Sequence, residues 1–128
     1  MNKILIVALG GAIGSSLRYL LAALIPRFIG KIFLWGTFSV NIIGSILIGI
    51  LWAYFENEST SFNLKLFLVV GVLGGFTTFS SFALESINLF RTEDIKLAIF
   101  YIFATNIFGL FGAFGGYYLS KEILTMLY

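Results

Sequence analysis

The chain has 128 residues, of which 59% are hydrophobic and 11% charged, with a formal net charge of +2 and a mean hydropathy of +1.02. A soluble domain carries roughly 25% charged residues, so this chain has too few to cover a surface that faces water. It contains no Cys and no His, which excludes disulfides and thiolate or imidazole metal sites, and its few scattered charges form no basic patch for nucleic acid.

Four apolar segments predict an all-α integral membrane protein with four transmembrane helices. A spanning helix needs about 20 apolar residues, so the chain has room for four spans and short loops but for no soluble catalytic domain. We expect a single transmembrane domain over residues 1–128, with spans at about 4–25, 32–55, 64–90 and 95–119. Pro26 is expected to close the first span, and the polar residues 56–61 to form the clearest loop.

The first segment carries Gly10, Gly14 and Arg18 at four-residue spacing, so the three share one helix face. Because Arg18 interrupts the apolar run and more spans follow, we do not interpret this segment as a cleaved signal peptide. Two interpretations of Arg18 remain open. Its side chain either snorkels to the nearer interface or binds backbone carbonyls, or it adds positive potential to a vestibule for anions.

Polar residues also recur every four positions in the second and fourth segments. They are Thr37, Asn41 and Ser45 in the second, and Tyr101 and Thr105 in the fourth, where Gly109 follows at the same spacing. Asn41 lies near mid-membrane, where its amide either joins two helices by hydrogen bonding or donates to a passing anion. The hydroxyls of the fourth segment are likewise either part of a helix interface or a line of donors.

The third segment is unusual because residues 74–82 contain paired glycines and four hydroxyls where lipid favours Leu or Val. Unwinding at residues 74–78 would free backbone carbonyls, which form cation sites in the broken helices of transporters. After this mid-membrane break, Phe79 and Phe82 project from one side of the restarted helix, with Ser81 and Glu85 on a neighbouring face. Ring edges are positive, and weak sites of this kind suit anion conduction.

The basic residues give almost no instruction about orientation in the membrane. One side of the predicted bundle has three (Lys3, Lys65 and Lys121), and the other has four (Arg27, Lys31, Arg91 and Lys96). The positive-inside rule therefore leaves two possibilities. Either weaker cues orient the chain, or copies insert in both directions and pair as an antiparallel, dual-topology homodimer, whose breaks would meet at the two-fold axis around a cation such as sodium.

Three motifs, in this order along the chain, resemble those of the Fluc (CrcB) fluoride channels. They are Gly11-x-x-Gly14-x-x-x-Arg18-Tyr19, Gly36-Thr37-x-x-Val40-Asn41-x-x-Gly44 and Gly71-x-x-Gly74-Gly75-x-Thr77-Thr78-Phe79-Ser80-Ser81-Phe82. The resemblance covers three segments by motif and all four by layout. It implies a fluoride-selective channel in the plasma membrane that exports fluoride passively through two pores of an antiparallel homodimer, with a structural sodium ion at the dimer centre.

The resemblance also implies roles for individual residues. Gly74 and Thr77 would give backbone carbonyls to sodium, and Arg18 would lie near the vestibule. The fluoride path would include Asn41, Thr78, Phe79, Ser81, Phe82, Glu85, Tyr101 and Thr105. Gly109 stands where some relatives carry Ser, which puts that end of the fourth-helix polar line in question. Ser81 replaces the commoner Thr and keeps the hydroxyl.

Two other functions compete with a fluoride channel, and none of the three is enzymatic. A proton-coupled small multidrug transporter is also a four-helix, dual-topology protein, but it needs a carboxylate within the membrane, and Glu85 is the only candidate inside a span. The third candidate is a structural membrane protein without transport activity.

Overall fold

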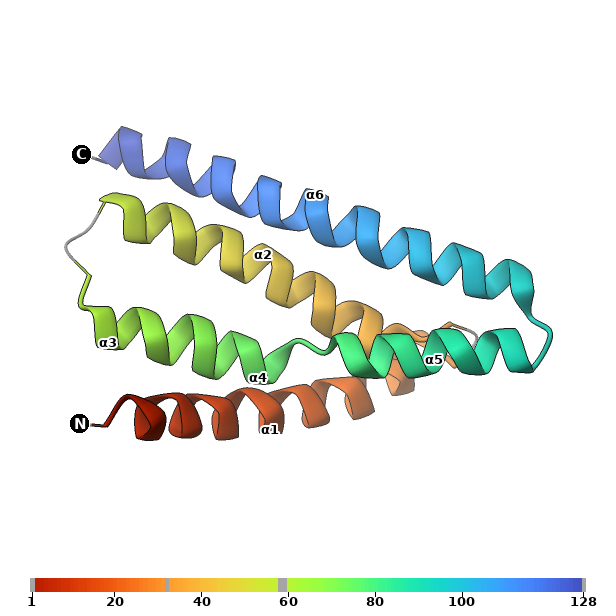
Figure 1. Ribbon diagram of the computed structural model, residues 1–128. Helices are drawn as coiled ribbons and strands as arrows, with labels where there is room; N and C mark the ends of the chain where they lie inside the picture. The colour runs from red at the N-terminus through yellow and green to blue at the C-terminus, as the bar shows by residue number, and fades with distance from the viewer. Residues whose placement is uncertain (1, 32, 58–59, 128) are drawn as a thin grey trace.

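The computed structural model describes residues 2–31, 33–57 and 60–127, which form a bundle of helices (Figure 1). In chain order the helical elements are α1 (Lys3–Ile29), α2 (Trp35–Asn57), α3 (Phe62–Lys65), the π-helix η1 (Leu66–Leu73), α4 (Gly74–Phe76), α5 (Phe79–Arg91) and α6 (Ile95–Leu127). The elements α3 to α5 follow one another along a common direction and together form the third segment (Figure 1).

Four segments of the described chain are long and apolar enough to cross a membrane: Lys3–Ile29, Trp35–Glu56, Phe62–Arg91 and Ile95–Leu127. Large apolar side chains cover their outer surfaces, as at Phe111, which is 72% exposed. An apolar surface of this extent suits lipid rather than water. The predicted all-helical fold with four spans is therefore confirmed for the described residues.

The direction of the segments determines which helices are neighbours. In Figure 1, α1 and the third segment run one way, whereas α2 and α6 run the other, so that both chain ends lie at the same end of the bundle. The parallel helices α2 and α6 pack against each other, and α1 packs on η1 and α4. Val40 of α2 and Tyr101 of α6 are the largest fully buried side chains.

The prediction that Pro26 closes the first helix was wrong. The helix continues through Pro26 to Ile29, and Gly30, at φ 113°, ends it by donating its N–H to the Pro26 carbonyl at 3.0 Å. A proline within a helix removes one hydrogen bond and crowds the carbonyl four residues before it. The helix tolerates both effects here because Pro26 lies in its last turn. A positive φ suits Gly30, since glycine has no Cβ to clash with the backbone.

Three other predicted boundaries also differ from the structure. Glu56 and Asn57 belong to α2 rather than to the following loop, and α6 continues to Leu127, eight residues beyond 119. The third difference is the extent of the interruption in the third segment, which we expected over residues 74–78 and which the structure limits to Thr77 and Thr78. Residues Ile32, Glu58 and Ser59, which we assigned to the second span and its loop, lie outside the described residues.

The interruption in the third segment is confined to two residues. Gly74–Phe76 forms the helical turn α4, because Thr77 N–H still donates to the Leu73 carbonyl at 3.0 Å. Thr77 (φ −77°, ψ 156°) and Thr78 (φ −148°, ψ 107°) are extended, and α5 begins at Phe79.

Close contact between α1 and the third segment depends on Gly14. A Cβ added there would overlap the backbone carbonyl of Val72, and it would lie 2.9 Å from the N atom of Phe76. Backbone atoms cannot move aside as a flexible side chain can. By contrast, a Cβ at Gly11 in the same helix would meet its first neighbour at 4.0 Å.

We therefore expect Gly14→Ala to lower the stability of the protein, by about 1–3 kcal/mol as is typical of overpacked cores. Gly11→Ala is the matched control and should leave stability unchanged or slightly higher, because Ala favours the helix over Gly. The measurement is the fraction of detergent-solubilised protein that remains monodisperse after heating. Equal stability of the two variants would contradict the assigned contact.

Candidate functional site

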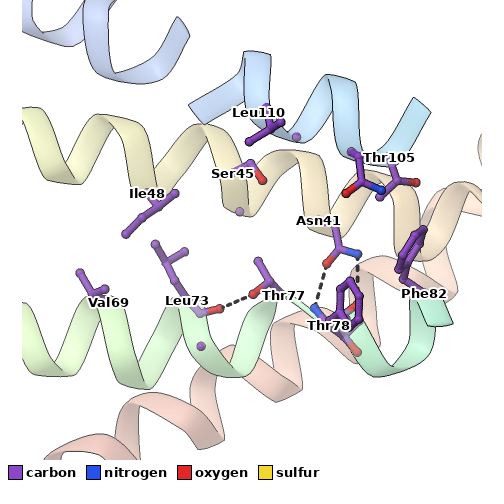
Figure 2. Close-up of a pocket in the computed structure, with 15 residues that line it drawn as sticks. Asn41, Ser45, Ile48, Val69, Leu73, Thr77, Thr78, Phe82, Thr105 and Leu110 are labelled. Carbon is purple, nitrogen blue, oxygen red and sulfur yellow. Dashed lines mark hydrogen bonds between the residues drawn. The ribbon is translucent and has the colours of Figure 1, made fainter. Parts of the chain in front are cut away.

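A cavity of about 480 Å³ opens between α2, the third segment and α6 (Figure 2); we call it the central cavity. Its polar lining consists of Asn41, Ser45, Thr77, Thr78, Thr105 and Asn106, and both rings of the Phe79–Phe82 pair also line it. Residues that are far apart in the sequence, and that we singled out separately, therefore meet at one place. Gly74, which we expected together with Thr77 to give a backbone carbonyl to sodium, also lines this cavity.

Asn41 holds the extended part of the third segment. Its Oδ1 accepts a hydrogen bond from Thr78 N–H at 2.8 Å, and its Nδ2 donates to the Thr78 carbonyl at 3.1 Å (Figure 2). Both backbone groups of an extended residue thus find partners away from water, as a buried backbone requires. The helix-joining interpretation of Asn41 is therefore correct, and the second hydrogen of its amide is left for another acceptor.

The same arrangement releases a carbonyl of the preceding turn. In a continuous helix Thr78 N–H would donate to the Gly74 carbonyl, but here it donates to Asn41. The hydroxyl of Thr77 donates to the Leu73 carbonyl at 3.0 Å, so it turns back towards α4. The Gly74 and Thr77 residues therefore stand at a helix end whose last carbonyls lack their helical donors.

Thr78 also starts the next helix and connects to a second polar region. Its Oγ1 accepts from Ser81 N–H at 3.2 Å, as an N-cap does, and it donates to the hydroxyl of Ser81 at 2.9 Å. A second cavity, of about 340 Å³, lies on the α1 side and is lined by Thr78, Ser80, Ser81 and Arg18, among others. Thr78 therefore lines both cavities, whereas Arg18 lines the second cavity and not the central one.

The two phenylalanines form a row of rings with Tyr101. Phe79 and Phe82 have ring centroids 5.4 Å apart, and the Phe82 and Tyr101 centroids are also 5.4 Å apart. Phe82 is 7% exposed, whereas Phe79 is 77% exposed in the single chain. Such a large exposed ring beside hydroxyls is unlike the core position that a phenylalanine pair at helical spacing usually takes.

Glu85 sits at the far end of this row. Its Oε1 accepts from the Thr37 hydroxyl at 2.7 Å, and its Oε2 accepts from the Tyr101 hydroxyl at 2.6 Å. The carboxylate joins α2, α5 and α6 through two short hydrogen bonds, of the kind that charge assistance strengthens. Glu85 and Tyr101, which we expected separately on the fluoride path, thus contact each other, but neither lines the central cavity.

Two polar residues of α2 in this region were absent from the sequence-based site: Thr37, which holds Glu85, and Ser45, which lines the central cavity. The signal for both was their four-residue spacing from Asn41. That spacing identifies a face of α2, but it does not reveal that this face meets α6.

Comparison with known proteins identifies the family of the chain. The profile of the family described as "CrcB-like protein, Camphor Resistance (CrcB)" matches residues 5–117. The chain belongs to the CrcB family. The resemblance inferred from the three motifs is therefore confirmed.

Several relatives in this family match nearly the whole chain. A protein of Parabacteroides distasonis is 45% identical over 127 residues, 99% of each chain. A protein of Thermus thermophilus is 47% identical over 124 residues, 97% of this chain and 99% of its own. Both are named fluoride-specific ion channel FluC. With its four spans, the chain is a multi-pass protein of the plasma membrane.

Removing the Asn41 side chain should destabilise the extended residues. Asn41→Ala leaves both backbone groups of Thr78 without their partner, and a buried unsatisfied group costs roughly 1–3 kcal/mol. We expect lower resistance to SDS unfolding in mixed micelles and faster hydrogen exchange at the Thr78 amide.

Asn106→Ala is the matched control, because the Asn106 amide is exposed and donates only to its own helix, at 2.7 Å to the Ile102 carbonyl. Equal effects of the two substitutions would show that Asn41 has no special role in holding Thr78.

Proposed function

We propose that this protein is a fluoride channel that lets fluoride leave the cytoplasm by passive electrodiffusion and so lowers its toxicity. The observation that carries the proposal is the high identity over nearly full length to relatives named as fluoride-specific channels. The central cavity supports it, since hydroxyl groups, amide groups and the two phenylalanine rings gather there within a membrane bundle. Ion channels form a non-enzymatic class, and no catalytic residue is proposed.

Fluoride is small and strongly hydrated, so a path through the membrane must replace its water with many hydrogen-bond donors. The donors of the path that we propose are Asn41, through its second amide hydrogen, the edges of the Phe79 and Phe82 rings, and the hydroxyls of Ser81 and Thr105. The Thr78 and Tyr101 hydroxyls lie along the same path, where their protons hold Ser81 and Glu85 in place. Each of these donors is a neutral, weak site, and conduction needs sites that an ion can leave. Arg18 would raise the local anion concentration in the second cavity, which it lines with Ser81.

Glu85 has a different part in this proposal. A carboxylate repels an anion, but Glu85 accepts hydrogen bonds from both Thr37 and Tyr101. It thereby fixes the orientation of the Tyr101 hydroxyl beside the ring row. A proton-coupled multidrug transporter would instead need this carboxylate to exchange protons with substrate, and the relatives do not favour that alternative.

The proposed channel is an antiparallel homodimer with two pores. The central cavity is open on one side, where the Phe79 ring is exposed, and a second copy lying across it would close a path between the chains. The near balance of basic residues on the two sides supports insertion in both orientations. A single-chain mass in mild detergent would contradict this arrangement.

We further propose that a structural sodium ion binds at the dimer centre. The carbonyls of Gly74 and Thr77 stand at a helix end without their helical donors, and neutral oxygen ligands suit a hard monovalent cation. Two such carbonyls from each chain would supply four ligands. The ion would hold the two interruptions together. A dimer that stays intact and fully active after dialysis against sodium-free buffer would contradict this role.

The decisive experiment measures efflux from liposomes that contain the purified protein. With an ion-selective electrode, we expect rapid release of fluoride and negligible release of chloride from matched vesicles. An absence of fluoride release, or equal chloride release, would contradict the proposed function.

The ring pair provides a test of the path itself. Phe79→Ile and Phe82→Ile keep an apolar side chain but remove the positive ring edge, so each should lower fluoride flux about tenfold or more, given that loss of about 1.4 kcal/mol of stabilisation corresponds to a factor of ten. The dimer should persist on size exclusion. Phe111→Ile, at an exposed ring on the outer face of α6, is the control and should conduct normally. Wild-type flux in both ring variants would place the path elsewhere.

A further inference from the structure

The parallel helices α2 and α6 carry polar side chains that face each other in successive turns. Thr37 and Tyr101 meet at Glu85. Two turns further on, a Cβ added at Gly109 would lie 3.4 Å from the Ser45 hydroxyl oxygen. Both contacts join residues that are 64 positions apart (101 − 37 and 109 − 45). The same register pairs Asn41 with Thr105 in the turn between them, and Figure 2 shows these two side chains on facing helices of the central cavity.

Two hydroxyls of this series have no protein partner within the described part of the chain. Thr105 is 9% exposed, and its Oγ1 is a buried atom without a hydrogen bond. Burying a hydroxyl in this way is unfavourable unless something else accepts its proton. Ser45 also lines the cavity, and among the described residues its hydroxyl makes no hydrogen bond.

Several other hydroxyls in the spans donate within their own helix. Serine and threonine within a helix usually donate to the carbonyl one turn earlier. Ser86 donates to the Phe82 carbonyl at 2.8 Å, and Ser16 to the Ala12 carbonyl at 2.7 Å. Because Ser45 and Thr105 do not, their protons remain available to a ligand in the cavity, and a hydroxyl can rotate to present its proton.

We propose that Ser45 and Thr105 form a binding subsite for a small anion, which extends the path beyond Asn41 towards Ser45. The inference rests on the proposed function, and it adds Ser45 of α2 to the anion path. Gly109 contributes by being small, since the Ser45 hydroxyl occupies the space beside it. The polar series therefore passes from α6 at Thr105 to α2 at Ser45, beyond which the cavity lining becomes apolar at Ile48 and Leu110.

The test measures fluoride efflux from liposomes that contain Ser45→Ala, with wild type in parallel. One hydrogen bond to an anion is lost, so we expect flux about tenfold lower than wild type. Ser16→Ala is the matched control, because that exposed hydroxyl already donates to its own helix. The control should conduct at the wild-type rate, and all variants should give the same elution volume on size exclusion.

A second substitution separates loss of the hydroxyl from damage to α2. In Ser45→Ala the added Gly109→Ser side chain enters the space that the Ser45 hydroxyl has left. It returns a hydroxyl to the same turn from the opposite helix. We expect the double variant to recover flux to within about threefold of wild type. Its remaining deficit would then be smaller than the deficit of Ser45→Ala alone.

The possible results separate this inference from the proposed function. Wild-type flux in Ser45→Ala overturns the subsite while leaving the channel intact. Reduced flux without recovery in the double variant also overturns it, because the defect then arises from α2 packing. A lack of fluoride flux in the wild-type protein overturns the proposed function itself.

Discussion

Asn41 binds both backbone groups of Thr78, and the arrangement of the site depends on this pair of hydrogen bonds. In a bilayer the backbone cannot turn to water, so two extended residues need partners from the protein itself. An amide side chain is well suited to this, since it offers one acceptor and two donor hydrogens in fixed geometry. By taking the Thr78 N–H, Asn41 deprives the Gly74 carbonyl of its helical donor and allows α5 to restart at Phe79.

The position of Thr78 links two otherwise separate polar regions. Its backbone faces Asn41, while its hydroxyl caps α5 and bonds to Ser81 beside the Arg18 cavity. Thr78 therefore lines both cavities and lies between them. The backbone that ends α4 and the side chains that begin α5 have distinct chemistry, with carbonyl oxygens on one side and proton donors on the other. This division would allow the proposed cation site and the proposed anion path to lie within one turn of chain.

The sequence predicted the helical fold well, because backbone hydrogen bonding in a bilayer leaves an apolar segment of this length few alternatives to a helix. It predicted helix ends poorly. Pro26 disfavours helix before it, yet it lies in the last turn of α1, and the helix continues to Ile29. The faces of Asn41 and Thr105 were recognisable from spacing, but their meeting was not. Register between two helices is set by tertiary contacts, such as those of Ser45 with Gly109, that no single segment encodes.

An even number of crossings gives the chain a further property. Both chain ends lie at the same end of the bundle (Figure 1). If two copies were joined directly, the end of the first and the start of the second would be on the same side of the membrane, so both would insert in the same orientation. An inverted pair encoded by one gene would need a connecting segment that itself crosses the bilayer. The same geometry means that separate copies are the simplest way to obtain inverted symmetry from this fold.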